Sequence, residues 1–460
     1  MVKRDQVVIN ALPVLFAILL LVIYSFDKIV YLVVLMSPLS VQLSELVPGL
    51  GFDMFLPTEP LLFGLLIIFL LKVIYERGFD RDLLKHPVSV AIYINLAWIL
   101  ITAITSTMPL VSVKFWLSRV WFVVGFYFLA GKLFADRKNM EKYVWLYAGA
   151  LVIVILYSTY RHLGYGLYDK QAAHFVMSPF YNDHTSYGAV LAMYIPFLTL
   201  FTFGSSYPRK SKIIALFVLA VLLLGFILSY SRAAWLSLIV AFGVYVVMKL
   251  RIRFKPLFIT VLTMLVLFFL FQNRIFMMME QNSEQSSADF RTHISSMSNI
   301  TTDASNLERI NRWSCAIQMF EKKPFFGWGP GTYMFKYAPF QLNENRTIIS
   351  TNSADGGNAH SEYLGPLSES GLFGMLTFLL IIGVVVYTAV HTYTRLNEKA
   401  LKSLVLTALI GLVTYYIHGF LNNFLDTDKL SAPFWGFTAI IVALDIYSRK
   451  QQEQAQKNPD

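Results

Sequence analysis

A histidine and two arginines are the side chains of this 460-residue chain best suited to chemistry. His360 stands in the polar segment 358–363, directly before an apolar run, where a neutral imidazole could take a proton from a hydroxyl group. Arg232 and Arg309 carry the planar guanidinium that forms bidentate contacts with phosphate. A lone histidine is usually structural, and an arginine beside an apolar run can instead contact lipid headgroups. Both alternatives stay open at this point.

Further polar and aromatic residues lie close to the ends of apolar runs. Arg119 lies inside such a run, where a charge is either functional or paired with a carboxylate. Asp183 could simply cap the helix that follows it, and Arg312 could belong to a solvated face. Glu362 could orient His360 or assist it as a base. The candidates for substrate contact are Arg119, Asn182, Asp183, His184, Arg312, Glu362 and Tyr363.

The common nucleotide and metal motifs are missing from the sequence. It has no P-loop, no Rossmann glycine fingerprint and no His-Glu-x-x-His, and Cys315 is its one cysteine. Its eight histidines lack the spacing of metal ligands. We therefore expect no metal site and no cofactor, and a phosphate-using reaction would depend on arginines.

The amino-acid composition indicates that these side chains belong to a membrane protein. The chain is 56% hydrophobic and only 14% charged, whereas soluble domains carry roughly 25% charged residues. Most of the chain must therefore face lipid or other apolar helices. The net charge of +10 sits in short clusters between apolar runs, so it forms no basic stripe of the kind that binds nucleic acid.

Apolar runs of spanning length predict an all-α, polytopic bundle. Basic residues gather in alternate loops, which predicts that these loops and the C-terminus are cytoplasmic. Lys3 and Arg4 favour a cytoplasmic N-terminus as well, so one of the first two runs should not cross, which leaves about 12 spans. The runs are 8–25, 29–43, 59–75, 88–107, 113–133, 143–160, 186–203, 212–230, 232–249, 256–272, 364–390, 402–421 and 431–447.

The runs divide the chain into four parts. Residues 1–271 and 364–447 hold the N-terminal and C-terminal transmembrane helices, 272–363 form a large outer loop, and 448–460 form a cytoplasmic tail. We expect the polar end of that tail, from residue 451, to be disordered. Arg232 falls in a short turn on the same side as the large loop.

The large outer loop contains a helix signal. Apolar residues recur at Ile310, Trp313, Ile317 and Phe320 with a period near 3.6. Pro324 and Gly327 then end the pattern. We expect an amphipathic helix that lies on the membrane face and carries Arg309 and Arg312.

Several of these segments, in this order along the chain, resemble the O-antigen ligase/polymerase superfamily. The resemblance covers about residues 180–375. It is carried by four motifs: Asn182-Asp183-His184; Ser231-Arg232; Arg309 with Trp313 and the segment Pro324 to Gly331; and Asn358 to Leu364 with Glu369 to Gly374. One departure stands out. The family often carries Asn after the histidine, where this chain has Ser361 and then Glu362.

The resemblance implies a fold and a reaction. The fold would be that of lipid-dependent glycosyltransferases (GT-C-like), with the active site facing the periplasm of a bacterial inner membrane. The donor would be a glycan on undecaprenyl pyrophosphate, and transfer would be metal-independent and inverting. Arg232 and Arg309 would hold the pyrophosphate, and His360 would activate the acceptor hydroxyl.

Several functions remain as alternatives. A ligase would join the glycan to lipid A-core, and a polymerase would extend the lipid-linked glycan itself. A protein O-oligosaccharyltransferase is less favoured because such chains usually carry an extra outer region. A transporter would predict inverted repeats and helices broken at the midplane, and the sequence shows neither.

Overall fold

The computed structural model describes residues 26–46, 53–76, 79–251, 304–342 and 357–457. Ten helices in this part of the chain are long and apolar enough to cross a membrane. They are α4 (Thr58–Glu76), α6 (Pro87–Ile104), α7 (Pro109–Val123, continued by the π-helical Val124–Leu129 and by α8, Ala130–Leu133), α9 (Arg137–Leu163), α10 (His184–Phe203), α11 (Arg209–Leu228), α12 (Arg232–Lys249), α17 (Leu364–Arg395), α18 (Lys399–His418) and α19 (Asp428–Lys457).

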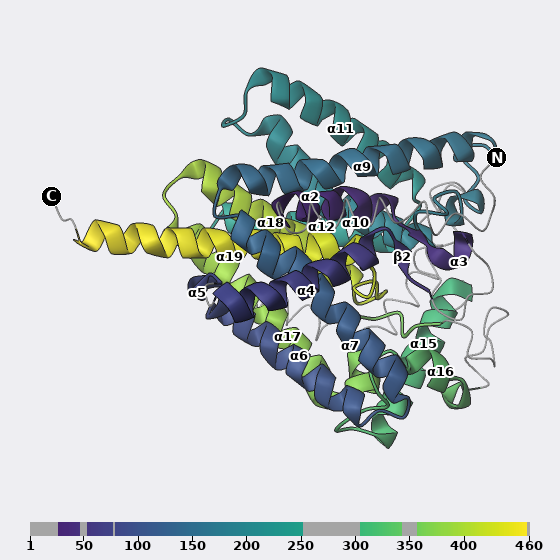
Figure 1. The fold of residues 1–460 in the computed structure, drawn as a ribbon. Helices are drawn as coiled ribbons and strands as arrows, with labels where there is room; N and C mark the ends of the chain where they lie inside the picture. The colour runs from purple at the N-terminus through teal and green to yellow at the C-terminus, as the bar shows by residue number, and fades with distance from the viewer. Residues whose placement is uncertain (1–25, 47–52, 77–78, 252–303, 343–356, 458–460) are drawn as a thin grey trace, which may run out of the picture.

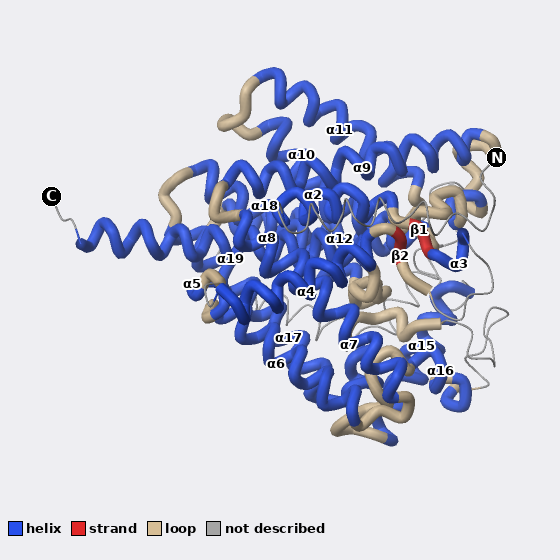
Figure 2. The backbone as a smooth tube through the Cα atoms, viewed as in Figure 1, coloured by secondary structure: helices blue, strands red, loops and turns tan. Residues whose placement is uncertain are grey.

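Shorter elements connect these helices. Two two-residue strands, β1 (Val41–Gln42) and β2 (Phe55–Leu56), pair in antiparallel fashion. The remaining elements are α2 (Phe26–Met36), η2 (Ser37–Leu39), α3 (Leu43–Leu46), α5 (Arg81–Leu84), η4 (Ala172–His174), α15 (Ala304–Lys322), α16 (Tyr333–Lys336) and η6 (Ala338–Phe340). The structure thus confirms an all-α, polytopic bundle (Figure 2).

The long helices run between two ends of the bundle (Figure 1). One end, called here the basic end, carries the loops with Arg137, Arg209 and Arg395. The opposite end, called the site end, carries α15 and α16. Helices α10, α18 and α19 are largely buried at the centre, whereas α4, α11 and α12 expose most of their apolar surface. Such exposed apolar helices are expected where lipid is the solvent.

Polar side chains define where several helices begin. The carboxylates of Asp80, Asp136 and Asp183 and the hydroxyl of Ser231 each accept a backbone N–H in the first turn of the following helix. Such N-caps satisfy donors that have no partner inside the helix. Helices α10 and α12 therefore begin at fixed residues of the site end.

A glycine-rich segment, Pro324–Gly331, is joined by backbone hydrogen bonds to a break in α17. Gly371 interrupts α17 with a φ of 69°. The Leu372 N–H donates to the Pro324 carbonyl at 2.9 Å, and the Gly329 N–H donates to the Glu369 carbonyl at 2.8 Å. A Cβ on Gly371 would overlap the Phe325 carbonyl, so the two backbones approach too closely for any other residue.

The basic end is held by an ion-pair hub at Asp445. His86 Nε2 lies 3.1 Å from its carboxylate and Arg449 Nε lies 2.7 Å from it, while Arg395 forms a third ion pair. Thr392 Oγ1 donates to the same carboxylate at 2.6 Å. Because the Asp445 side chain is almost fully buried, these partners offset the cost of removing its charge from water.

Most predicted spans that fall on described residues are confirmed as helices. The run 29–43 differs, because α2 ends at Met36 and a turn follows. The runs 8–25 and 256–272 lie outside the described residues. The prediction of a disordered tail is wrong for residues 451–457, since α19 continues to Lys457. Ion pairs of Arg449 with Asp445 and of Lys450 with Asp82 stabilise the preceding turn, and the tail itself is rich in good helix formers.

Candidate functional site

His360 lies at the site end in a constrained backbone conformation. Its φ of 47° is in the left-handed region, which costs energy for a residue with a Cβ. The Asn358 side chain accepts the His360 N–H at 3.0 Å, and Trp313 Nε1 donates to the His360 carbonyl at 3.2 Å. Asn358 in turn donates to the Asn423 carbonyl at 3.4 Å. These contacts hold the backbone of His360 between α15 and the loop after α18.

The surroundings of His360 keep its imidazole neutral. Burial lowers the pKa of His360 to about 4, and the charges of Arg309 and Arg312 lower it further, against the opposing effect of Asp183 and Glu308. A neutral ring has a free lone pair at pH 7 and can accept a proton. Arg309 and Arg312, whose charges lower the pKa of His360, therefore lie within electrostatic range of its ring.

Helix α15 supplies both of these arginines, and they differ in their contacts. Arg309 is half-buried, and its Nε donates to the Leu421 carbonyl at 3.3 Å. Arg312 is buried; its Nε donates to Glu308 Oε1 at 2.6 Å, and its guanidinium lies 3.9 Å from the centre of the Tyr337 ring. The alternative of a solvated face is therefore wrong for Arg312. Its predicted contact with substrate stays a prediction.

The predicted amphipathic helix is present as α15. The face that it buries against the protein differs from the predicted apolar stripe of Ile310, Trp313, Ile317 and Phe320. Asn311, Cys315 and Met319 are fully buried against the protein. Ile317, in the predicted stripe, is 45% exposed. Ile310, Trp313 and Phe320 are half-buried, so the stripe lies at the edge of the buried face of the helix.

Arg232 begins α12 after a tight turn. Tyr230 has a φ of 48°, and the Ser231 hydroxyl accepts the Ala234 N–H at 3.4 Å. Gly188 of α10 approaches this turn so closely that a Cβ there would lie 2.8 Å from the Ser231 Cβ. The Arg232 side chain is exposed. The turn therefore fixes the start of α12 against α10 and leaves the guanidinium accessible.

The first turn of α10 carries Asp183 and His184. Asp183 Oδ1 accepts the Thr185 N–H at 2.6 Å and the Ser186 N–H at 3.0 Å, so the capping role is confirmed. The His184 ring lies 4.0 Å from that of His174, and its electrostatic environment includes both Arg232 and Arg309. Asn182 is exposed, and its predicted contact with substrate stays a prediction.

Two histidines at the site end were missed by the sequence analysis. His174, from the loop before α10, contacts His184. His418 ends α18, is fully buried, and lies within electrostatic range of Asp183, His184 and Arg309. In the sequence, the position of His418 at the end of an apolar run could have identified it as a candidate. Arg232, Arg309 and the histidines thus come together from α10, α12, α15 and α18.

Glu362 holds the loop between α18 and α19. Its Oε1 accepts the Tyr415 hydroxyl at 2.5 Å and the N–H groups of Phe424 and Leu425 at 2.7 and 2.9 Å. Burial raises the pKa of Glu362, while the Arg119 charge and the Tyr415 hydrogen bond oppose this rise. These contacts give Glu362 a structural role, and an action on His360 stays a prediction.

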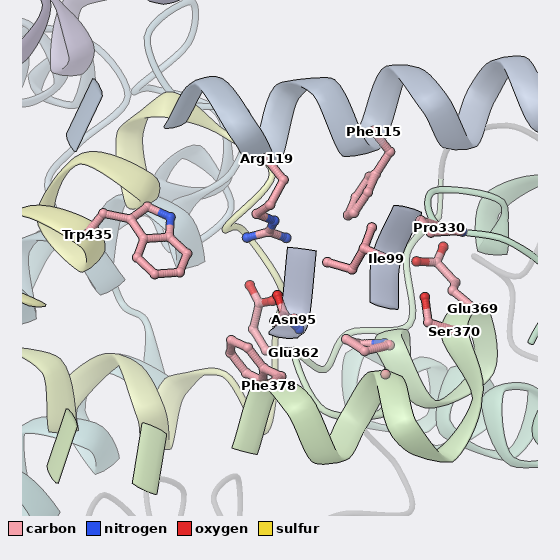
Figure 3. A pocket seen from close by; sticks show the side chains of 12 residues that line it. Asn95, Ile99, Phe115, Arg119, Pro330, Glu362, Glu369, Ser370, Phe378 and Trp435 are labelled. Carbon is pink, nitrogen blue, oxygen red and sulfur yellow. The ribbon is translucent and has the colours of Figure 1, made fainter. Parts of the chain in front are cut away.

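Arg119 and Glu362 line a small chamber whose other walls are largely apolar (Figure 3). Its volume is about 40 Å³, enough for a few water molecules. Arg119 Nη1 donates to the Leu425 carbonyl at 3.1 Å, so it steadies the same loop from the opposite side.

Tyr363, the last predicted contact residue, packs inside the protein. Its hydroxyl donates to the Tyr416 carbonyl at 2.8 Å, and its ring stacks on Phe420 at 4.3 Å. Contact of Tyr363 with substrate stays a prediction. No group of three metal-ligating side chains was found among the described residues.

A lateral groove runs from the site end toward the basic end. It has a volume of about 690 Å³ and is formed by α10, α12 and α18. Trp235 lines it one turn after Arg232, and Lys249 lines it at the other end of α12. These residues are 14 positions apart, about 21 Å along a helix. Most of the other lining residues are apolar, including Leu238, Ile239 and Phe242.

The fold and the site together define a multi-pass helical membrane protein with arginines and a neutral histidine at one end. Residues 215–379 match the family model described as O-antigen ligase. This segment extends from α11 into α17 and contains Arg232, Arg309 and His360. This match confirms the resemblance to the O-antigen ligase superfamily over that segment. No curated protein matches the chain.

Proposed function

We propose that this protein transfers a glycan from undecaprenyl pyrophosphate to a sugar hydroxyl of lipid A-core at the periplasmic face of the bacterial inner membrane. The observation that supports the proposal is that Arg309 lies within electrostatic range of both neutral His360 and His184, and Arg232 within range of His184, at the end of the bundle opposite the basic loops. Basic loops favour the cytoplasmic side, so the site end faces the periplasm.

The lateral groove supports a donor with a long apolar chain. Its outer end lies one helical turn from Arg232. A polyprenyl chain in the groove would therefore leave its pyrophosphate beside the exposed guanidinium. Charge on the phosphate would stay at the membrane surface while the hydrocarbon stays in the apolar region, as the cost of burying a charge requires.

The proposed reaction needs one base and a stabilised leaving group. His360 takes the proton of the acceptor hydroxyl, and the oxygen attacks the anomeric carbon of the donor sugar from the side opposite the pyrophosphate. The bond between that carbon and the phosphate oxygen breaks, and its electron pair leaves with undecaprenyl pyrophosphate. Arg232 and Arg309 stabilise this developing negative charge. The product is an inverted glycosidic bond, with no nucleotide consumed.

A polymerase that extends the lipid-linked glycan would use the same chemistry. The two functions differ in the acceptor, so we propose the ligase on the sequence resemblance of the histidine segment and the large loop. The test is deletion of the gene in the native host, followed by gel analysis of the lipopolysaccharide. A ligase predicts lipid A-core without polymer and full-length chains on the lipid carrier. Core capped with a single repeat unit would identify a polymerase instead.

A further inference from the structure

The loop between α18 and α19, residues 419–427, contacts Arg309 through its backbone. Arg309 Nε donates to the Leu421 carbonyl at 3.3 Å. Because a guanidinium is planar and presents its N–H groups in a fixed fork, a hydrogen bond at Nε restrains the direction of the whole group. Bidentate contact with a phosphate depends on that direction. The position of the Leu421 carbonyl therefore affects how Arg309 can bind a phosphate.

The same loop is joined to His360 less directly. Asn358 accepts the His360 N–H at 3.0 Å and donates to the Asn423 carbonyl of the loop at 3.4 Å. The His360 carbonyl has a separate support on α15, where Trp313 Nε1 donates to it at 3.2 Å. A shift of the loop should therefore act first on Arg309, whose guanidinium bonds to the loop itself.

Glu362 fixes the path of this loop from inside the protein. Its Oε1 accepts the Phe424 and Leu425 N–H groups at 2.7 and 2.9 Å, and it accepts the Tyr415 hydroxyl at 2.5 Å. The Tyr415 hydroxyl in turn accepts the Phe424 N–H at 3.1 Å. Glu362, Tyr415 and Leu425 are all buried. Loss of the carboxylate would leave backbone donors without this acceptor, so the loop would have to shift or bear that cost.

We propose that Glu362, supported by Tyr415, is a positioning residue of the transfer reaction, which holds the 419–427 loop so that the Leu421 carbonyl directs Arg309 toward the departing pyrophosphate. The inference rests on the proposed function. In this role Glu362 acts through the loop and takes no proton from the acceptor. A displacement of about 1 Å at a site can lower a rate by about 10²-fold, so a loop that aims an arginine has a large effect on transfer.

Two buried tyrosines offer a matched pair of substitutions. Tyr415→Phe removes the hydroxyl that bonds to Glu362. Tyr143→Phe removes a hydroxyl that is equally buried but donates to the Ala432 carbonyl of α19, beyond the loop, at 2.7 Å. Each change deletes one oxygen and one hydrogen bond to a buried partner. The two variants should therefore lose similar amounts of stability, and only Tyr415→Phe should disturb the loop.

The experiment gives each purified full-length protein the lipid-linked glycan and lipid A-core extracted from the deletion strain, and measures kcat, KM and the melting temperature. We expect Tyr415→Phe to lower kcat about fivefold, as the loss of one hydrogen bond does, while Tyr143→Phe keeps the wild-type kcat per folded molecule. In an Arg309→Ala background, Tyr415→Phe should have less than about a twofold further effect, because residues that act through one another are not additive. A general loosening of the fold would lower kcat by the same factor in both backgrounds.

Substitution of Glu362 itself separates positioning from a role as a base. Glu362→Ala should lower kcat about 10²-fold, because the loop loses its acceptor. Glu362→Gln should recover most of this loss, because an amide oxygen with two lone pairs can still accept two of the three donors. An amide cannot take up a proton at neutral pH, so a base would be lost equally in both variants.

The outcomes distinguish this inference from the proposed function. Three results would overturn the inference while the wild-type protein still transfers glycan: a wild-type kcat in Tyr415→Phe, an equal loss from Tyr415→Phe in both backgrounds, or a Glu362→Gln protein as inactive as Glu362→Ala. If the wild-type protein itself transfers nothing, the proposed function fails and the inference fails with it.

Discussion

The basic end and the site end of the bundle both carry charged side chains, and they arrange them differently. At the basic end, Asp445 is surrounded by Arg395, Arg449 and His86, all within ion-pair distance. At the site end, arginines face histidines, and the Nδ1 atoms of His184 and His418 are buried with no hydrogen-bond partner among the described residues.

The difference indicates what each end is for. A buried charge that serves structure is matched by partners that belong to the protein. The site end instead places arginines near histidines, two of which have a buried ring nitrogen without a hydrogen-bond partner among the described residues. Such a site gains most when an anion binds, which is the property expected where a pyrophosphate leaves.

The sharpest test of this contrast is to remove one histidine from each end. We expect His360→Ala to lower transfer by about 10²- to 10⁴-fold, the usual contribution of a general base, with an unchanged protein level. His86→Ala should lower thermal stability and leave transfer per folded molecule intact. In vitro transfer with purified protein and a melting curve in detergent measure both. A comparable loss of transfer in both variants would show that the two ends of the bundle do not differ in function.

Substitution of an arginine at the site end should have the next largest effect. Arg309→Ala should cost about 10²- to 10³-fold in kcat, as loss of one transition-state donor does. Arg309→Lys should recover only part of it, because an ammonium group cannot make the bidentate contact. Rate measurements at saturating donor test this. Full activity of Arg309→Lys would argue against bidentate phosphate binding.

Removal of the carboxylate at the basic end should affect stability alone. Asp445→Ala leaves Arg395 and Arg449 without their shared partner, and breaking a buried pair costs about 3–5 kcal/mol. Thermal unfolding in detergent should show this loss, while transfer per folded molecule stays within about twofold of wild type. A selective loss of transfer would show that the basic end also acts in the reaction.

A smaller effect is expected from pH. The pKa of His360 is lowered to about 4, so the free protein keeps a neutral base down to about pH 5. Since kcat/KM reports the free enzyme, its profile should be flat from pH 8 to pH 5 and fall only below that. An acid limb in kcat/KM near pH 6.5 would show that His360 has its ordinary pKa or is not the base.

The smallest effect should come from a chelator. Because arginines are proposed to stabilise the pyrophosphate, EDTA should leave transfer unchanged. A loss of activity that added Mg²⁺ restores would instead point to a metal at the site end and would weaken the role given to Arg232 and Arg309.

Sequence reasoning reached most of the described spans because each leaves a local signal, and it named candidate site residues from short motifs. A run of 20 apolar residues identifies a helix by itself, whereas the motif around His360 becomes specific only together with the Arg232 and Arg309 motifs in the same order. The partners of Glu362 gave no such signal, since Tyr415, Phe424 and Leu425 lie more than 50 positions away. Its role in holding a loop therefore emerged only from the fold. His418 did stand at the end of an apolar run, but only the fold brings it near Asp183, His184 and Arg309.

The hydrogen bonds of Glu362 also affect the stage of synthesis at which the protein can become active. The histidine segment precedes α17, but the groups that hold it come from α18 and from the loop after it. A nascent chain that has inserted α17 therefore carries the histidine segment without its contacts to α18 and to the loop after it. The site is completed only after residue 425 has been made and inserted, so a chain truncated after α17 should be present in the membrane and inactive.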